Sequence, residues 1–347
     1  MTYTWTFAIA FIVAILATPV SMKLGRRWGA ISYPGGRHVH KYPVPRLGGI
    51  AIYAAFWLAV IFLGDWNREI WGLFLGSTLI VAVGVIDDIF ELRPAVKLVW
   101  QIIAATLLLF FGFSMNHISL PLIGSVNFAN MGLAWLGLLL AVFWVVGVVN
   151  TVNISDGLDG LAAGICFQAA LLLFWSANRI GEVTEAHLTL ALAGAALGFL
   201  IFNFHPAKVF MGDSGSMFLG YIIGGVSIMG LLKTATVLGL IFPLLILGMP
   251  LADLTFAIIR RKLRGHSIAQ GDRGHIHHRL LDGGCSQRQA VLILYLISGC
   301  FGVAAVLGTL GYWGWATVLL MADFALLLTI IFRRTAFLTA MSRRHSK

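Results

Sequence analysis

The sequence has 347 residues, of which 59% are hydrophobic and only 11% are charged. Soluble domains carry roughly 25% charged residues, so this composition excludes an ordinary soluble enzyme and indicates an integral membrane protein. Lys and Arg outnumber Asp and Glu by 24 to 14, which gives a net charge of +10.

Apolar segments recur along the whole chain, and a membrane span takes about 20 such residues. We expect an all-α, polytopic bundle of about eleven transmembrane helices that forms one domain over residues 1–347. No Lys or Arg precedes the first segment, which we interpret as a span rather than a cleaved signal peptide. The expected spans are 5–22, 48–64, 70–86, 97–113, 131–150, 160–178, 186–203, 215–232, 236–259, 290–308 and 311–332.

The basic residues predict the orientation of this bundle. One set of alternate connections, together with the C-terminus, holds 21 of the 24 Lys and Arg residues, and the other side holds Arg68, Arg179 and Lys233. Positively charged loops stay in the cytoplasm, so we expect the N-terminus outside and the C-terminus in the cytoplasm. This signal and contacts with lipid headgroups explain most of the positive charge, and we predict no nucleic-acid partner.

The first polar cluster lies where the third span ends, in VIDDIFELRPAVK. Asp87 and Asp88 are adjacent like charges that need a counter-cation, which could be Lys97 at the start of the next span, an arginine or a metal ion. A solvated acidic helix end is the plainer alternative. Carboxylates at a helix C-terminus oppose the helix dipole, which disfavours that alternative.

Four polar residues follow at intervals of three in NTVNISDGLDG: Asn150, Asn153, Asp156 and Asp159. On a straight helix each interval of three turns back by about 60°, so the first and last could not face one ligand. We predict that the asparagines end the fifth span and that the aspartates lie on a glycine turn into the sixth, where all four can converge. A simple polar turn is the alternative.

The stretch NFHPAKVFMGDSGSMFLG places Asp213 on a glycine-rich turn at the start of the eighth span. Amides at a helix start can hold a phosphate oxygen while the carboxylate holds Mg²⁺, and a plain helix cap is the alternative. GDSG also surrounds the nucleophile of chymotrypsin-like proteases, but a position between two membrane spans excludes that interpretation.

The longest cytoplasmic loop carries His275, His277 and His278 between Arg273 and Arg279. Histidine and arginine donors together suit a phosphate or diphosphate. Zinc and a solvated loop are the alternatives, and the flanking arginines disfavour a cation.

These clusters predict phosphoryl transfer between a water-soluble nucleotide compound and a lipid phosphate. The sequence has no Walker A string and no Rossmann fingerprint, which disfavours a membrane ATPase or a redox enzyme. The competing class is a transporter or flippase, in which Asp253 and Asp323, within apolar runs, would relay protons. No inverted repeat supports that class.

The motifs PVPRLGG, DD, NxxNxxDGxDGLA, VFMGDSGS and HIHHR, in this order, resemble those of the polyprenyl-phosphate N-acetylhexosamine-1-phosphate transferases over nearly the whole chain. That superfamily includes the undecaprenyl-phosphate GlcNAc-1-phosphate transferases, which start O-antigen, enterobacterial common antigen and wall teichoic acid synthesis, and the phospho-MurNAc-pentapeptide translocase. The translocase branch tends to carry three adjacent histidines, so HIHHR favours UDP-GlcNAc over a MurNAc-pentapeptide substrate.

The resemblance implies a multi-pass protein of the bacterial cytoplasmic (inner) membrane with its active site on the cytoplasmic face. It implies UDP-N-acetylhexosamine and undecaprenyl phosphate as substrates, Mg²⁺ as cofactor with Mn²⁺ as an alternative, contact with membrane lipids, and a homodimer as a candidate assembly. The catalytic residues that it implies are Asp87, Asp88, Asp156, Asp159 and Asp213, with Asp213, Asp87 and Asp88 at the metal. Those implied for substrate binding are Arg46, Lys97, Asn150, Asn153, Phe210, His275, His277, His278 and Arg279. We expect Asp88 to act mainly by positioning.

Overall fold

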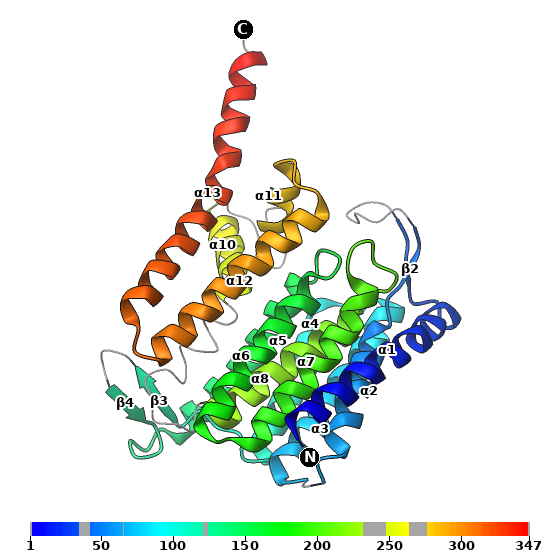
Figure 1. The fold of residues 1–347 in the computed structure, drawn as a ribbon, viewed down its shortest axis with the longest axis vertical. Helices are drawn as coiled ribbons and strands as arrows, with labels where there is room; N and C mark the ends of the chain where they lie inside the picture. The colour runs from blue at the N-terminus through cyan, green and yellow to red at the C-terminus, as the bar shows by residue number, and fades with distance from the viewer. Residues whose placement is uncertain are drawn as a thin grey trace. The chain divides into compact units, whose positions relative to one another are not determined.

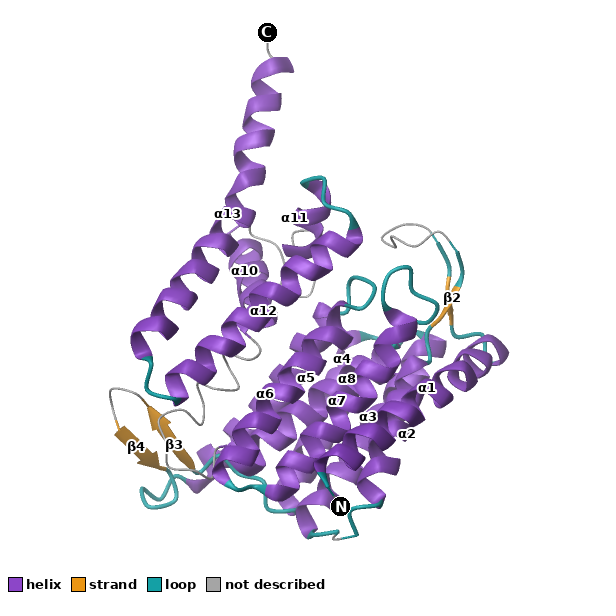
Figure 2. Ribbon diagram, in the orientation of Figure 1, coloured by secondary structure: helices purple, strands orange, loops and turns teal. Residues whose placement is uncertain are grey.

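The structure is a computed structural model that describes residues 2–34, 42–64, 66–120, 124–231, 248–263 and 276–345. The chain divides into two compact units, Met1–Pro243 and Leu244–Lys347, and each is described here by itself. Helices dominate both units, as Figure 2 shows, which confirms the expected all-α fold class. The expectation of one domain over residues 1–347 stays a prediction.

The first unit is a helical bundle with two short hairpins, coloured blue to green in Figure 1. Its elements are α1 (Tyr3–Arg27), β1 (Ile31–Ser32), β2 (Val44–Pro45), α2 (Gly48–Ile61), α3 (Arg68–Phe90), α4 (Pro94–Phe110), β3 (His117–Leu120), β4 (Gly124–Asn127), α5 (Ala134–Ser155), α6 (Leu161–Ile180), α7 (Val183–Asn203), α8 (Gly212–Val226) and the π-helical turn η1 (Ser227–Leu231). Strand β1 pairs antiparallel with β2, and β3 pairs antiparallel with β4. These hairpins add to the helical bundle that the sequence predicts.

Helix α8 is the central helix of this unit. It contacts α2, α3, α5, α6 and α7, and all its residues except Asp213 are buried. Small residues provide the room for this packing, because helices without a large side chain between them approach closely. A Cβ on Gly49 of α2 would overlap with the backbone of Gly215, and one on Gly84 of α3 would overlap with that of Ser214. Helices α2 and α3 therefore fix the start of α8, which carries Asp213.

The second unit consists of α10 (Gly248–Leu263), α11 (Ile276–Asp282), α12 (Gln287–Thr309) and α13 (Trp313–His345). Helix α12 contacts the other three. It begins with a capping box, in which the Gln289 amide donates to the Ser286 hydroxyl and the Gln289 side chain accepts from the Ser286 amide. This cap fixes where α12 begins.

Seven helices among the described residues are long and apolar enough to cross a membrane: α1, α3, α5, α6, α7, α12 and residues Trp313–Ile330 of α13. Helices α2 and α4 are apolar but shorter. The protein is therefore a multi-pass helical membrane protein. Nine of the expected spans coincide with described helices, and the expected spans 215–232 and 236–259 lie partly outside the described residues. The count of eleven and the orientation stay predictions.

Candidate active site

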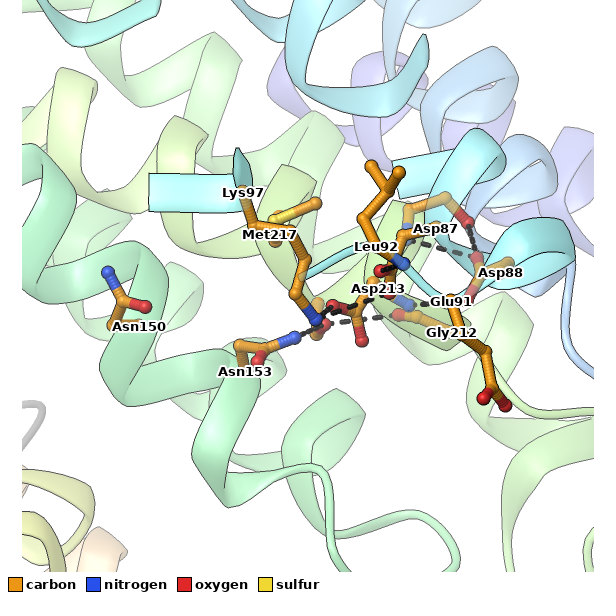
Figure 3. Close-up of polar contacts among 12 residues, drawn as sticks. Asp87, Asp88, Glu91, Leu92, Lys97, Asn150, Asn153, Gly212, Asp213 and Met217 are labelled. Carbon is orange, nitrogen blue, oxygen red and sulfur yellow. Dashed lines mark hydrogen bonds and ion pairs between the residues drawn. The ribbon is translucent and has the colours of Figure 1, made fainter. Parts of the chain in front are cut away.

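Three carboxylates from two helices lie together where α3 ends and α8 begins (Figure 3). Asp87 and Asp88 are in the last turn of α3, and Asp213 is in the first turn of α8. Each offers one oxygen atom, and these atoms all lie within 4.8 Å of one another. Over the described residues this is the one such group of three candidate metal ligands. Carboxylate oxygens are the ligands that Mg²⁺ prefers.

Asp88 holds the N-terminus of α8. Its Oδ1 accepts from the Asp213 amide at 2.8 Å, and its Oδ2 accepts from the Ser214 amide at 3.2 Å and the Ser214 hydroxyl at 2.7 Å. The first amides of a helix lack partners within the helix, and a carboxylate there also complements the helix dipole. Asp88 is only 3% exposed, so it acts as a buried cap supplied by the neighbouring helix.

Asp87 faces a different set of partners. Its Oδ1 accepts from the Leu92 amide at 2.8 Å, and its Oδ2 lies 3.3 Å from the Lys97 Nζ. The same ammonium group lies 2.7 Å from Asp213 Oδ2, as Figure 3 shows. Lys97 at the start of α4 therefore joins the two carboxylates, and of the three counter-cations that the sequence leaves open, the structure shows the lysine.

The two asparagines of the NTVNISDGLDG motif lie in the last turns of α5, as the sequence predicts. Asn153 donates to the Ser216 hydroxyl at 2.8 Å, next to the carboxylates. Asn150 donates to the Gln101 side chain of α4 at 2.7 Å and lies to one side of the carboxylates in Figure 3. The two side chains thus have different partners, and their predicted contacts with substrate stay predictions.

The two aspartates of this motif lie on the turn 156–160 between α5 and α6, again as predicted. Burial and the nearby charges of Asp213 and Asp88 raise the pKa of Asp156 to about 8, against a smaller opposite effect of Arg46. Asp159 turns toward the segment between α7 and α8, where its Oδ2 contacts His205 at 2.7 Å. Asp156 is thus in the field of Asp88 and Asp213, while Asp159 belongs to a second polar contact.

The segment 44–49 packs against the chain that leads into α8. The Phe210 amide donates to Pro45 O, and the amides of Gly48 and Gly49 donate to the carbonyls of Phe210 and Met211. These bonds place Arg46 and Phe210, both predicted to bind substrate, on joined backbones beside Asp213. The Arg46 guanidinium also lies 3.7 Å from Glu91, which is exposed.

The histidine motif begins helix α11 in the second unit. The Ile276 amide donates to Asp253 Oδ1 at 2.7 Å, and His277 Nδ1 lies 3.9 Å from Asp253 Oδ2. Asp253 and His277 are both buried, whereas His278 and Arg279 are partly exposed, and the rings of His277 and His278 lie 4.3 Å apart. Asp253 therefore anchors the start of α11. His275 lies outside the described residues.

Residues 70–231 match the model of glycosyl transferase family 4. The chain is 37% identical, over 86% of its length and 83% of the relative, to the probable undecaprenyl-phosphate N-acetylglucosaminyl 1-phosphate transferase of Bacillus subtilis. It is 36% identical, over 85% and 80%, to the decaprenyl-phosphate N-acetylglucosaminephosphotransferase of Mycobacterium tuberculosis. The chain belongs to the polyprenyl-phosphate N-acetylhexosamine-1-phosphate transferase family. A phospho-N-acetylmuramoyl-pentapeptide-transferase of Shouchella clausii is 32% identical over 89% of the chain and 96% of the relative.

Some residues that hold the predicted site residues in place are not among those that the sequence predicts. Ser214 and Ser216 bond to Asp88 and Asn153, and both stand in the GDSGS string, where only Asp213 is singled out. His205 stands in NFHPAK without an assigned role. Polar residues inside an already recognised motif were the signal that could have found them.

Proposed function

We propose that the protein transfers N-acetylglucosamine 1-phosphate from UDP-N-acetylglucosamine to undecaprenyl phosphate and releases UMP. The observation that carries the proposal is the carboxylate group Asp87, Asp88 and Asp213 with Lys97, in a chain whose relatives are named for this kind of transfer. The site would lie on the cytoplasmic face of the bacterial inner membrane, as the distribution of Lys and Arg supports.

The donor set fits a magnesium ion. Asp87 and Asp213 each place one carboxylate oxygen next to the Lys97 ammonium, at 3.3 and 2.7 Å, so this pair already holds a positive charge. Asp213 with Asp87 and Asp88 would hold the ion, and Mn²⁺ would suit the same oxygens. When bound, Mg²⁺ would neutralise diphosphate charge and stabilise the leaving UMP.

The chain's own residues then serve positioning and charge compensation, which dominate phosphoryl transfer. An oxygen of the lipid phosphate attacks the sugar-linked phosphorus of the nucleotide sugar, and the bond from that phosphorus to the bridging oxygen breaks. The attacking phosphate is largely dianionic at pH 7, since the second pKa of a phosphate monoester is about 6, and needs no strong base. Lys97 and Arg46 offer cationic groups to the phosphates, and Asp156 and Asp159 bind the nucleotide sugar.

UMP release tests this proposal. Purified protein with undecaprenyl phosphate, Mg²⁺ and a panel of UDP-sugars should release UMP fastest with UDP-GlcNAc. A transporter would release none in detergent, and preference for UDP-MurNAc-pentapeptide would place the protein with the translocase, to which the Shouchella clausii relative also points.

Metal binding can be tested apart from turnover. Mg²⁺ should raise the melting temperature of the wild type in detergent and leave that of Asp213→Asn unchanged, because the substitution removes the ligand charge. A wild-type melting temperature that does not respond to Mg²⁺ or Mn²⁺ would refute the proposed metal site.

A further inference from the structure

One polar contact of the turn between α5 and α6 involves a residue, His205, that has no role in the chemistry above. His205 lies on the segment between α7 and α8, and its Nδ1 is 2.7 Å from Asp159 Oδ2. An ionised carboxylate only accepts hydrogen bonds, so Nδ1 carries the proton and donates. The Ala207 amide donates to the same oxygen at 3.1 Å. Two donors two residues apart thus hold one oxygen of Asp159, and Oδ1 takes part in neither contact.

A second pair of bonds joins the same two segments. The Gly160 amide donates to Asn203 Oδ1 at 3.1 Å, and the Asn203 amide group donates to Val209 O at 2.9 Å. Gly160 has a φ of +83°, and a Cβ there would lie 3.1 Å from the Phe204 ring, so the turn approaches the segment closely. The backbone on both sides of the Asp159–His205 contact is therefore fixed without it.

In this arrangement the backbone of the turn does not depend on His205, whereas the direction of the Asp159 side chain does. The side chain of Asp159 is 10% exposed and that of His205 is 36% exposed, so the contact lies at the edge of the packed region. A contact that is partly open to solvent and not required for the backbone path is suited to orienting a carboxylate toward a ligand. The hydrogen bond involves a charged acceptor, which makes it stronger than a neutral one.

We propose that His205 is a positioning residue that orients Asp159 toward a hydrogen-bond donor of the nucleotide sugar. The inference rests on the proposed function, in which Asp159 binds the nucleotide sugar. His205 acts through Asp159 and is not itself a catalytic residue, so its loss should weaken binding of UDP-GlcNAc and leave the chemical step and the lipid substrate unaffected.

The test compares three variants in the UMP-release assay. His205→Ala should raise KM for UDP-GlcNAc about ten- to hundredfold, the size expected for a lost hydrogen bond to a charged group, with kcat and KM for undecaprenyl phosphate within about twofold of wild type. His205→Asn should recover most of the affinity, because its amide nitrogen takes the place of Nδ1. His205→Gln is the matched control, since its nitrogen lies one bond further out, and should not recover it.

A double-mutant cycle shows whether His205 acts through Asp159. In an Asp159→Ala background, adding His205→Ala should raise KM for UDP-GlcNAc no further. Additive effects would overturn the proposal, as would a melting temperature and kcat that fall together, which mark a merely structural role. If the wild type releases no UMP from any donor, the proposed function fails; if it does and His205→Ala keeps its KM, only this inference fails.

Discussion

Replacing Asp88 by Asn tests whether this residue caps α8 or acts as a base. The carboxylate accepts three hydrogen bonds from the start of α8, at 2.7, 2.8 and 3.2 Å, within a buried site. Asn keeps one acceptor oxygen but turns an amide N–H₂ toward a backbone N–H. At least one buried amide of α8 then loses its partner, and the helix start loses its negative charge.

The expected cost follows from these contacts. A hydrogen bond to a charged group contributes about 1.5–3 kcal/mol, and the interaction with the helix dipole adds about 0.3–1 kcal/mol or more when buried. Together, these losses destabilise the packed start of α8, which places Asp213 in the site, by about 2–4 kcal/mol. At about 1.4 kcal/mol for each factor of ten, turnover should fall roughly 30- to 1,000-fold if the whole cost falls on that arrangement.

The assay is UMP release by Asp88→Asn from pH 6 to pH 9, with the melting temperature measured alongside. We expect a loss of activity that is the same across this range and a lower melting temperature. Glu91→Gln is the matched control, because Glu91 follows the same helix end but is 85% exposed in its side chain, and it should stay within about threefold of wild type. Recovery of most activity at pH 9 with an unchanged melting temperature would refute the capping role and support a base.

Three further outcomes follow from the structure. Gly212→Ala should abolish turnover, because Gly212 has a φ of +68° and a Cβ there would overlap with Arg46 O and both Asp88 oxygens; an active variant would contradict this packing. Asp253→Ala should release the start of α11, seen as faster proteolysis after Arg279 and at least tenfold slower UMP release, whereas a proton relay in a transporter predicts unchanged release. In the metal-free protein, the pKa of Asp156 is about 8 in the folded state and 3.8 ordinarily. The folded protein therefore loses stability as the pH rises from 3.8 to about 8. Asp156→Asn should therefore flatten the fall in melting temperature between pH 5 and pH 8, and an unchanged slope would exclude that pKa.

The sequence predicts which residues gather at the site better than it predicts what each one contacts. The adjacent pair Asp87 and Asp88 shows why. Neighbours on a helix point about 100° apart, so one faces Lys97 and the other faces α8, and the choice depends on where α8 packs. That packing is a long-range property set by glycines of α2 and α3, which no local pattern in the sequence reveals.

Distance along the chain also limited the interpretation of Asn150 and Asp253. The glycine turn predicts that Asn150 and Asp159 can converge on one ligand although the spacing of threes separates them on a straight helix. In the structure Asn150 lies on α5 and donates to Gln101 of α4, a partner that the spacing does not reveal. Asp253 lies 23 residues before the amide that it caps, and an isolated carboxylate in an apolar run gives no sign of such a partner. The predicted contacts of substrate with Arg46, Lys97, Phe210, His277, His278 and Arg279 stay predictions.

The burial of α8 on all sides has a consequence for how the protein is made. Helix α8 begins with Gly-Asp-Ser-Gly-Ser and has almost no exposed surface. Because polar groups are costly in lipid, α8 needs its neighbouring helices to reach its folded position. The carboxylate group can then form only when α3 has packed against α8. Assembly of the bundle and creation of the site are one event, and substitutions at Gly49, Gly84 or Gly215 would behave in a cell like catalytic mutations although they touch no substrate.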